Sequence, residues 1–376
     1  MVKQLHVALL AGERSGDVLG GALMQALKKR YPSVSFSGIG GQAMQEQGLH
    51  SLVAMERLSV MGLVEVVAHL PDLWRVRQVA RKYWQENPPD IFIGIDAPDF
   101  NLPMARFLRA RGAFCVHYVS PSLWAWKEKR IEKIKGAVDL MLCLFAFETA
   151  IYAQHGVQAV AVGHSLRDKL ANSVKNTGGD GHTLGIFAGS RRAEIARLLP
   201  VYLQAFAQLQ ERLPQVKAVV SVSEAHLYDL VAQCVQASGV SQVQLSLAPS
   251  AQLLAQCSLA LVSSGTITLE AALLQTPMVV AYKVQALTAA IARRLLKIDR
   301  FALPNLLDHR DLVPEYIQEN ATADKISAAL YALWSDGALQ QAQREGFARI
   351  AQALPLNVAD CAAQAVLTAY AQKVVR

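Results

Sequence analysis

Short apolar runs alternate with helical patterns along most of the chain. The apolar runs occupy residues 6–10, 34–39, 91–95, 114–119, 157–162, 184–187, 259–262 and 278–282. Runs of this length that are apolar on both faces are typical of buried parallel strands. With helices between them, they predict an α/β fold made of two doubly wound, Rossmann-like domains.

A change in composition separates the strands and helices of the first predicted domain from those of the second. The segment 171–183 contains Thr177-Gly-Gly-Asp-Gly181 and predicts an interdomain linker. At 376 residues the chain is too long for one ordinary core. We therefore expect an N-terminal domain over residues 1–170 and a C-terminal domain over residues 184–344, facing each other across a central cleft.

The run 91–95 turns abruptly polar at Asp96 and continues through Pro98 to Asp99 and Asn101. Open α/β sheets bind ligands at the carboxyl ends of their strands, so these carboxylates are candidate catalytic groups. Because proline biases the preceding residue toward an extended conformation, we expect Asp96 and Asp99 on an irregular loop. The alternatives are that Asp99 caps the next helix and that Asp96 only ends a strand.

The first strand is followed by Gly12-Glu-Arg-Ser-Gly-Asp17, with a predicted helix over residues 18–29 that Asp17 could cap. A strand, glycine loop and helix can cradle phosphate, but this spacing is not the dinucleotide fingerprint. A plain tight turn is the alternative. Because Glu13 would repel a diphosphate, we expect it to face a substrate that carries hydroxyl groups.

Apolar residues recur at helical spacing over residues 58–70, and a basic helix with a tryptophan follows Pro71. The apolar positions include Val60, Met61, Leu63, Val64, Val67 and Leu70, and the later helix carries Trp74, Arg75, Arg77, Arg81 and Lys82. This combination is typical of a helix that lies in a membrane interface. A core-facing helix with a solvated basic side is the alternative.

Further candidates follow other strands. In Ser120-Pro-Ser-Leu-Trp-Ala-Trp126, the indoles of Trp124 and Trp126 could contact a sugar or an acyl chain, or simply be buried. In the second half, Gly189-Ser190-Arg191-Arg192 and Ser264-Gly265-Thr266 open helices, where backbone donors and guanidinium groups favour a bound diphosphate. Glu270 lies one helical turn further on, and its carboxylate could accept ribose hydroxyls.

Composition narrows the choice of partner. The net charge of +7 favours an anionic partner, namely a nucleotide, a phospholipid or a nucleic acid, and the absence of a reading motif disfavours nucleic acid. Five scattered cysteines without Cys-x-x-Cys argue against a zinc site or a disulfide framework and for a reducing compartment. The sequence contains no Asp-x-Asp, so we expect arginine and helix dipoles, with no metal or other cofactor, to neutralise a leaving diphosphate.

The order of these motifs resembles that of the lipid A disaccharide synthases, a bacterial GT-B-type glycosyltransferase family. The matching motifs are Ala11-Gly-Glu-Arg-Ser-Gly-Asp17, Ser59-Val-Met-Gly-Leu-Val-Glu65, Ile95-Asp-Ala-Pro-Asp-Phe-Asn101, His117-Tyr-Val-Ser-Pro-Ser-Leu-Trp-Ala-Trp126, Gly189-Ser-Arg191, Ser264-Gly-Thr-Ile-Thr-Leu-Glu270 and Leu303-Pro-Asn-Leu-Leu307. The departures are Phe187-Ala188, where the family usually has Leu-Pro, and Arg14, where it usually has a small residue.

The resemblance implies transfer of a sugar from UDP-2,3-diacylglucosamine to 2,3-diacylglucosamine 1-phosphate (lipid X). The products would be a β-1,6-linked disaccharide 1-phosphate and UDP, with inversion at the anomeric carbon. The resemblance also implies attachment to the cytoplasmic face of the inner membrane, and a C-terminal helix over residues 345–376 that returns to the first domain. Whether the chain forms a homodimer is left open.

For this reaction Asp96 is the expected general base, and Asp99 is the second candidate. Glu13 and Asn101 would position sugar hydroxyls, and Ser120, Trp124 and Trp126 complete the acceptor side. On the donor side, Arg191 would stabilise the departing UDP, Glu270 would hold the ribose and Asn305 would close the nucleotide site. Residues 287–296 could form a second membrane-facing patch.

Other functions remain open at this point. A hydrolysing sugar-nucleotide epimerase or a transferase acting on a polyprenyl-linked sugar would keep the fold and change the reaction. A noncatalytic, membrane-associated nucleotide-binding module would keep only the second-half site. A dinucleotide-dependent dehydrogenase is disfavoured because no fingerprint glycine triplet follows the first strand.

Overall fold

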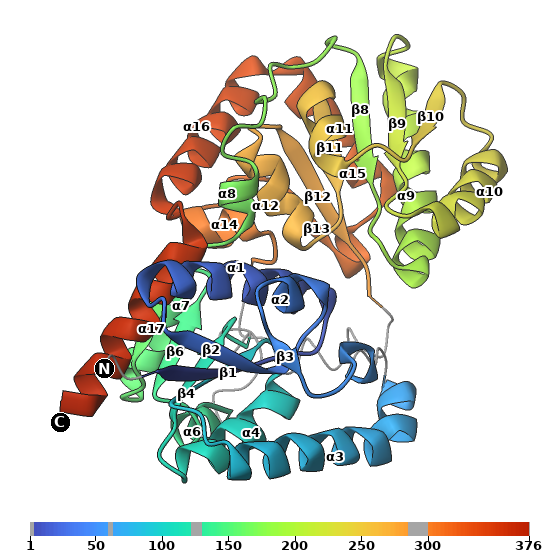
Figure 1. Cartoon of the computed structure of the whole chain (residues 1–376). Helices are drawn as coiled ribbons and strands as arrows, with labels where there is room; N and C mark the ends of the chain where they lie inside the picture. The colour runs from blue at the N-terminus through green and yellow to red at the C-terminus, as the bar shows by residue number, and fades with distance from the viewer. Residues whose placement is uncertain (1–3, 59–62, 122–129, 285–299, 376) are drawn as a thin grey trace. The chain divides into compact units, whose positions relative to one another are not determined.

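The computed structural model describes residues 4–58, 63–121, 130–284 and 300–375 (Figure 1). Two compact units share the chain. Unit 1 comprises Met1–Asp168 and Pro355–Arg376, and unit 2 comprises Lys169–Leu354. Each unit is a parallel sheet covered by helices on both faces, so the predicted α/β class with two doubly wound sheets is confirmed.

Unit 1 contains a seven-stranded parallel sheet with the order β3-β2-β1-β4-β5-β6-β7. The strands are β1 (Leu5–Ala11), β2 (Val34–Ile39), β3 (His50–Ser51), β4 (Ile91–Ile95), β5 (Phe114–Tyr118), β6 (Leu140–Cys143) and β7 (Ala159–Ala161). Ala11 pairs with Ile95, and Ile95 pairs with Tyr118. The carboxyl ends of β1, β4 and β5 therefore lie level at one edge of the sheet.

Helices cover both faces of this sheet. They are α1 (Arg14–Arg30), α2 (Gln42–Glu46), α3 (Leu63–Glu86), α4 (Pro98–Arg109), α6 (Arg130–Lys135), α7 (Ala146–Gln154), α8 (Leu166–Lys169) and α17 (Val358–Val375), with a 3₁₀ turn η1 (Met55–Arg57). Helices α1 and α17 pack on one face, whereas α3 and α4 pack on the other (Figure 1). Helix α3 runs continuously through Pro71, where the sequence predicts two helices.

The stretch Gly337–Val375 is long and apolar enough to cross a membrane by length and composition. It consists of two helices, α16 (Gly337–Ala353) in unit 2 and α17 in unit 1. Helix α17 buries Ala362, Ala363 and Val366 in the core of unit 1. Its first backbone N–H groups are bound by Asp168, whose oxygens accept from Asn357 and Val358 at 2.7 and 2.8 Å. Helix α17 therefore packs one of its faces on the sheet of unit 1.

Unit 2 contains a six-stranded parallel sheet with the order β10-β9-β8-β11-β12-β13. The strands are β8 (Thr183–Phe187), β9 (Lys217–Ser221), β10 (Val243–Ser246), β11 (Leu259–Val262), β12 (Met278–Tyr282) and β13 (Glu315–Ile317). The remaining helices are α9 (Arg192–Arg212), α10 (Tyr228–Ser238), α11 (Ser250–Gln256), α12 (Thr266–Leu273), α14 (Leu303–Asp308) and α15 (Ala323–Ser335), with 3₁₀ turns η2 (Ala225–Leu227) and η3 (Gln318–Asn320).

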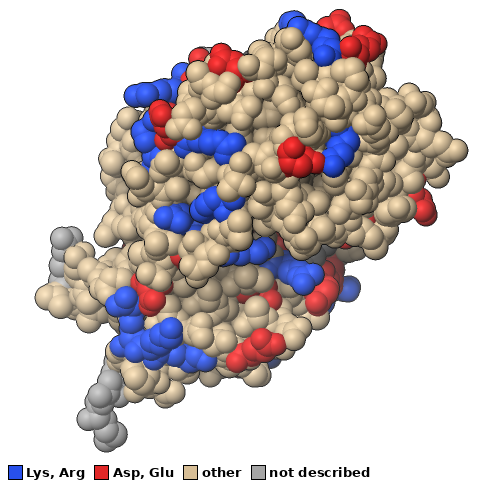
Figure 2. All heavy atoms as spheres, turned by 90° about the horizontal axis from the view of Figure 1, so that it is seen from above, with Lys and Arg blue, Asp and Glu red and all other residues tan. Residues whose placement is uncertain are grey.

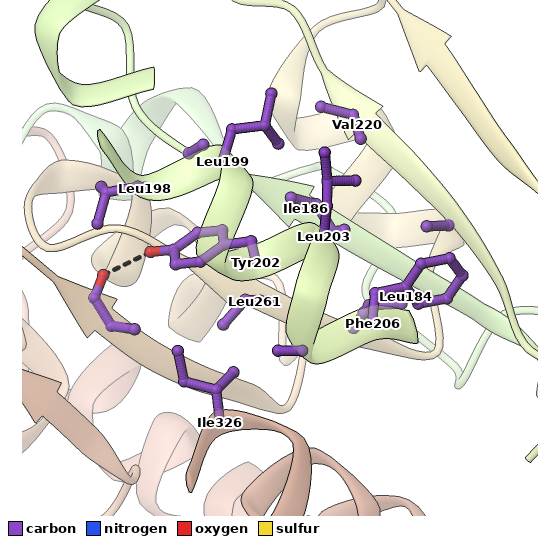
Figure 3. Packing of buried hydrophobic residues seen from close by; sticks show 14 of the residues in the cluster. Leu184, Ile186, Leu198, Leu199, Tyr202, Leu203, Phe206, Val220, Leu261 and Ile326 are labelled. Carbon is purple, nitrogen blue, oxygen red and sulfur yellow. Dashed lines mark hydrogen bonds between the residues drawn. The ribbon is translucent and has the colours of Figure 1, made fainter. Parts of the chain in front are cut away.

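Helix α9 anchors one face of this sheet. Figure 3 shows its Tyr202 and Phe206 packed with Ile186 of β8, Leu261 of β11 and Ile326 of α15. The phenol of Tyr202 is buried and donates to the carbonyl oxygen of Ala281, the dashed line in Figure 3. Burying a hydroxyl group without a hydrogen bond would cost free energy, and this bond removes that cost. Helix α9 is therefore held both by packing and by the Tyr202 hydrogen bond.

The segment 171–183 lies within unit 2. Its Asn176 is buried, and Nδ2 donates to the carbonyl oxygens of Leu254 and Cys257, both at 2.6 Å. The segment is thus pinned to α11. On the face seen in Figure 2, basic side chains stand in several separate groups with acidic side chains between them, so the net charge of +7 is not gathered there into one stripe.

Candidate functional site

The turn after β4 has an unusual backbone. Asp96 (φ 51°) and Ala97 (φ 40°, ψ 57°) are both left-handed, a conformation that costs free energy for residues other than glycine. The expected extended Ala97 is therefore wrong, and of the two carboxylates expected on an irregular loop only Asp96 lies in the turn between β4 and α4. Helix α4 begins at Pro98, whose fixed φ suits a first helical position, and Asp99 lies in its first turn. Strain at the end of a buried strand is typical of functional sites.

Asn101 holds this turn from below. Its Nδ2 donates to the carbonyl oxygens of Asp96 at 2.7 Å and Ile95 at 3.1 Å. The side chain occupies the space beside Gly94, where a Cβ would lie 2.8 Å from the Asn101 Cβ. Because Asn101 is fully buried and bound to the main chain, the structure does not support the expected contact between Asn101 and sugar hydroxyls. It positions the backbone that carries Asp96.

The glycine loop after β1 lies next to this turn. A Cβ built at Gly12 would stand 3.8 Å from the Cβ of Ala97. Glu13 is the N-cap residue of α1, and its side chain is exposed and makes no capping bond. The parallel register of β1 and β4 thus brings Glu13 to the edge of the sheet where Asp96 and Asp99 project, and all three carboxylates are exposed.

Asp17 does not cap the helix that the sequence assigns to it. It lies within α1 and is buried, and its carboxylate accepts from the backbone N–H groups of Gly41, Ala43 and Met44 at 2.7 to 3.1 Å. These are the free donors at the start of α2. Asp17 therefore ties α2 to α1 and stiffens the glycine loop.

A pocket of about 530 Å³ opens beside the carboxylates in unit 1. Its lining includes Glu13 and Asp99, the cation Arg77, the apolar side chains of Leu58, Leu70, Leu73, Trp74 and Phe100, and the turn residues Ala97 and Pro98. Leu70 and Trp74 are 52% and 61% exposed, high fractions for large apolar side chains. The pocket thus joins polar groups to an exposed apolar rim on α3. It suits an amphiphile with a polar head.

Several expected contacts lie elsewhere. Val60, Met61, Trp124, Trp126 and the second patch over residues 287–296 fall outside the described residues, as do the side chains of Leu63, Val64 and Val67. Ser120 is almost fully buried, and its Oγ lies 2.8 Å from the hydroxyl oxygen of Tyr152. A substrate contact by the Ser120 hydroxyl is therefore not supported, because its hydrogen-bonding capacity is used inside unit 1.

His117 is a feature that our sequence reasoning did not single out. It lies in β5 opposite Gly94, is 1% exposed, and neither ring nitrogen has a hydrogen-bond partner among the described residues. The Oδ1 atom of Asn101 is likewise buried without a described partner. Burial lowers the pKa of His117 to about 4, so the ring is neutral at pH 7. A histidine within an otherwise apolar strand was the available signal.

In unit 2, the glycine turn after β8 leads to an exposed arginine. Gly189 has φ 108° and Arg191 is the N-cap residue of α9. Arg191 Nη1 lies 3.5 Å from Glu194 Oε1, and Tyr282 donates to the same oxygen at 3.4 Å. The exposed Ser190 and Arg191, together with the first N–H groups of α9, form a site suited to an anion.

The turn after β11 reaches the same edge of the second sheet. Phe187 pairs with Val262, and Ser263 donates to the carbonyl oxygen of Phe187 at 2.9 Å. Gly265, with φ 129°, is the N-cap residue of α12, and Thr266 is its first residue. Ser264 Oγ donates to the carbonyl oxygen of Phe301 at 3.3 Å. Both expected UDP-binding turns therefore follow adjacent strands.

Glu270 lies in α12 one turn further on. Ser250, at the start of α11, donates to both carboxylate oxygens at 3.0 and 2.9 Å. Partial burial raises the pKa of Glu270, while the bond from Ser250 opposes that shift. Our sequence reasoning missed Ser250, because twenty residues separate it from Glu270. The pair offers fixed carboxylate oxygens one helical turn beyond the Gly265 turn.

The structure does not support the expected role of Asn305 in closing a nucleotide site. It is buried in α14, where Nδ2 donates to Val313 O and to Glu315 Oε1, and Oδ1 accepts from Val313 N at 2.8 Å. Its amide therefore holds the loop before β13 in place, inside unit 2. The described residues hold no cluster of three or more His, Cys, Asp or Glu side chains with metal-binding geometry.

Comparison with known proteins identifies the family. The family model for Lipid-A-disaccharide synthetase matches residues 7–369. A lipid-A-disaccharide synthase of Pseudomonas aeruginosa is 44% identical over 375 residues, which covers 98% of both chains.

Solved structures share the fold at low sequence identity. The glycotransferase of kitacinnamycin aligns with a TM-score of 0.64 at 16% identity over 98% of this chain and 100% of that chain. A UDP-GlcNAc 2-epimerase from Neisseria meningitidis, solved with UDP-GlcNAc, aligns with a TM-score of 0.62 at 12% identity over 98% and 100% of the two chains. These likenesses support the fold of GT-B glycosyltransferases and epimerases alike. The sequence match decides between glycosyltransferase and epimerase. The chain belongs to the lipid-A-disaccharide synthase family of glycosyltransferases.

Proposed function

We propose that this chain transfers the sugar of UDP-2,3-diacylglucosamine to the 6-hydroxyl of 2,3-diacylglucosamine 1-phosphate. The observation that carries the proposal is the exposed Asp96 on its left-handed turn, beside a pocket that combines carboxylates with an exposed apolar rim. A diacylated sugar has this combination of a hydroxyl-rich head and apolar chains. Unit 1 is the acceptor side and unit 2 the UDP side.

The reaction is a single in-line displacement. Asp96 takes the proton of the acceptor 6-hydroxyl as the oxygen forms its bond to the anomeric carbon of the donor, which inverts that centre. The bond between the anomeric carbon and the diphosphate oxygen breaks, and UDP leaves with both bonding electrons. Glu13 and Asp99 accept hydrogen bonds from sugar hydroxyls near the base.

UDP is held by unit 2. Arg191 and the N-terminus of α9 neutralise the departing diphosphate, and the turn Ser264–Thr266 with α12 supports it from the adjacent strand. Glu270 accepts the ribose hydroxyls with oxygens that Ser250 keeps in place. Arginine and helix dipoles thereby supply the charge that a divalent metal supplies in other transferases.

Membrane attachment forms part of the same proposal. Leu70 and Trp74 project from α3 with Arg75 and Arg77 nearby, an arrangement suited to the interface of an anionic membrane. The chain would thus work at the cytoplasmic face of the inner membrane, where its acylated substrates reside.

The direct test is product identification. Purified protein, UDP-2,3-diacylglucosamine and lipid X are combined in nonionic detergent with EDTA, and the lipids are analysed by mass spectrometry. The proposal expects a disaccharide monophosphate and one UDP per disaccharide. UDP release that does not require lipid X would favour the hydrolysing epimerase, and strict dependence of product on added Mg²⁺ would refute the metal-independent mechanism.

A further inference from the structure

The pocket of unit 1 carries a guanidinium in its wall. Arg77 projects from α3 toward α4, where its Cζ lies 4.9 Å from the ring centre of Phe100. Its Nη2 atom is 3.5 Å from the backbone carbonyl oxygen of Asp99. Both Phe100 and Asp99 also line the pocket. Stacking on the ring fixes the plane of the guanidinium and leaves its edge for a ligand.

Arg77 forms no ion pair with a carboxylate within the described part of the chain. No described carboxylate lies within 4.0 Å of its guanidinium nitrogens, and its Nε is shielded from solvent without a described partner. Burial lowers the pKa of Arg77, and Arg81 one turn further along α3 lowers it too. Arginine nevertheless stays charged at pH 7, so an anion in this pocket would form charge-assisted hydrogen bonds with it.

We propose that Arg77 binds the phosphomonoester of the acceptor sugar. This inference rests on the function proposed above and assigns one end of that substrate. Glu13 and Asp99 repel a phosphate but accept hydroxyls, whereas Arg77 on α3 attracts it. A glucosamine 1-phosphate in the pocket would therefore turn its phosphate toward α3 and its free hydroxyls toward the carboxylates, which orients the 6-hydroxyl for the base.

Arg81 provides a matched control. It also stacks on a phenylalanine, with its Cζ 4.8 Å from the ring centre of Phe107, and its Nε is also shielded without a described partner. Unlike Arg77, it is not among the residues that line the pocket. The two arginines are thus packed alike, but only Arg77 reaches the pocket. We therefore expect only Arg77 to bind the acceptor phosphate directly.

The test removes the arginine side chain and the acceptor phosphate separately and together, as in a double-mutant cycle. Lipid X and its dephosphorylated form, 2,3-diacylglucosamine, serve as acceptors for the wild type, Arg77→Ala, Arg77→Lys and Arg81→Ala in nonionic micelles. For Arg77→Ala we expect kcat/KM with lipid X to fall about ten- to a hundredfold, mainly through KM, with little change for the dephosphorylated acceptor. Arg77→Lys should recover part of the loss, and Arg81→Ala should keep most of the preference. An equal loss for both acceptors would overturn the assignment.

Anionic phospholipid headgroups offer the same chemistry from another source. Vesicles of phosphatidylcholine with and without phosphatidylglycerol separate the two. If Arg77→Ala lost binding to anionic vesicles but kept the preference for lipid X in micelles, Arg77 would serve the membrane and the proposal would be wrong.

Failure of the proposed function is distinguishable from failure of this inference. A wild type that makes no disaccharide from either acceptor would refute the reaction. Equilibrium binding of the two acceptors, followed by the fluorescence of tryptophan, would then decide the role of Arg77. Tighter binding of lipid X that disappears in Arg77→Ala supports the assignment, and equal binding of both acceptors by the wild type contradicts it.

Discussion

Asn101 donates from Nδ2 to the carbonyl oxygen of Asp96 at 2.7 Å, and this bond fixes the turn that carries the proposed base. Left-handed residues other than glycine cost about 1–3 kcal/mol each, so the turn needs support from outside itself. Asn101 provides it from the second turn of α4, and Asp96 N donates to Tyr118 O at 2.8 Å from the other side. The proposed base is thus held in place by hydrogen bonds to its backbone.

Replacing Asn101 by Ala should reduce kcat about a hundredfold, because a displaced base loses its alignment with the acceptor hydroxyl. UDP affinity, which we assign to unit 2, should be unchanged in calorimetric titration. Asn87→Ala is the control, since Asn87 is exposed just after α3, and among the described residues its side chain bonds only to Tyr83 O. A folded Asn101→Ala protein with kcat within twofold of the wild type would refute the positioning role.

Gly94→Ala should destabilise the protein by about 1–3 kcal/mol, because the added Cβ would overlap Asn101. The Cβ would stand 2.8 Å from Asn101 Cβ and 2.9 Å from Asn101 Cγ, both buried atoms that have little room to move. Gly136→Ala is the matched control, as its nearest new contacts are ordinary ones at 3.6 and 3.9 Å. Urea unfolding measures both. Equal midpoints for the two variants would contradict this packing account.

Glu270→Gln should weaken UDP binding about tenfold or more, because an amide accepts ribose hydroxyls less well than a carboxylate. Ser250→Ala should weaken it less, since the carboxylate stays but loses the hydroxyl that holds both oxygens. Combining the two changes should cost less than the sum of the single effects, as expected for residues in contact. Titration calorimetry with UDP gives the dissociation constants of the wild type, the two single variants and the double variant. Full additivity of the two effects would mean that Ser250 does not act through Glu270.

His117 should make the protein less stable in mild acid. Its pKa is about 4 in the fold because of burial, against about 6.5 when unfolded, so the unfolded state takes up a proton first as the pH falls. Stability from this group is complete above pH 6.5 and is lost between pH 6.5 and 4. At pH 5 the loss is about 2 kcal/mol.

The comparison is between the wild type and His117→Met, which cannot titrate and roughly fills the same space. Urea unfolding at pH 7.5 and pH 5.0 should show the wild type losing about 2 kcal/mol more than the variant over this interval. Parallel pH profiles would mean that His117 is protonated or solvated in the native protein.

The sequence predicted the two sheets well because buried parallel strands leave a strong local pattern. The runs 91–95 and 184–187 correspond to strands β4 and β8, and the polar residues after them do lie at the carboxyl ends of the sheets. Glycine turns before helices were equally legible at Gly189 and Gly265, because both need a positive φ. The apolar runs and the glycine turns are local patterns, each contained within a few consecutive residues, so the sequence alone reveals them.

The sequence did not reveal the bonds that several polar side chains make outside their own helix or strand. Asp17 looks like a local cap, yet it binds the start of α2, more than twenty residues later. Asn305 looks like a polar loop residue, but its amide is consumed by Val313 and Glu315. Ala97 does not take the extended conformation that a following proline favours. Asn101 binds the backbone of the adjacent Asp96 and supports the left-handed turn instead. No local pattern reports such tertiary contacts.

The most direct test of the account concerns the carboxylate on the left-handed turn. Asp96→Asn and Asp99→Asn are compared with the wild type in single-turnover assays with excess enzyme, and UDP affinity is measured in parallel. Asp96→Asn should lose about 10²–10⁴-fold in rate, Asp99→Asn should lose less, and both should bind UDP normally. Turnover by Asp96→Asn near the wild-type rate, or loss of its UDP binding, would contradict the assignment of Asp96 as the base.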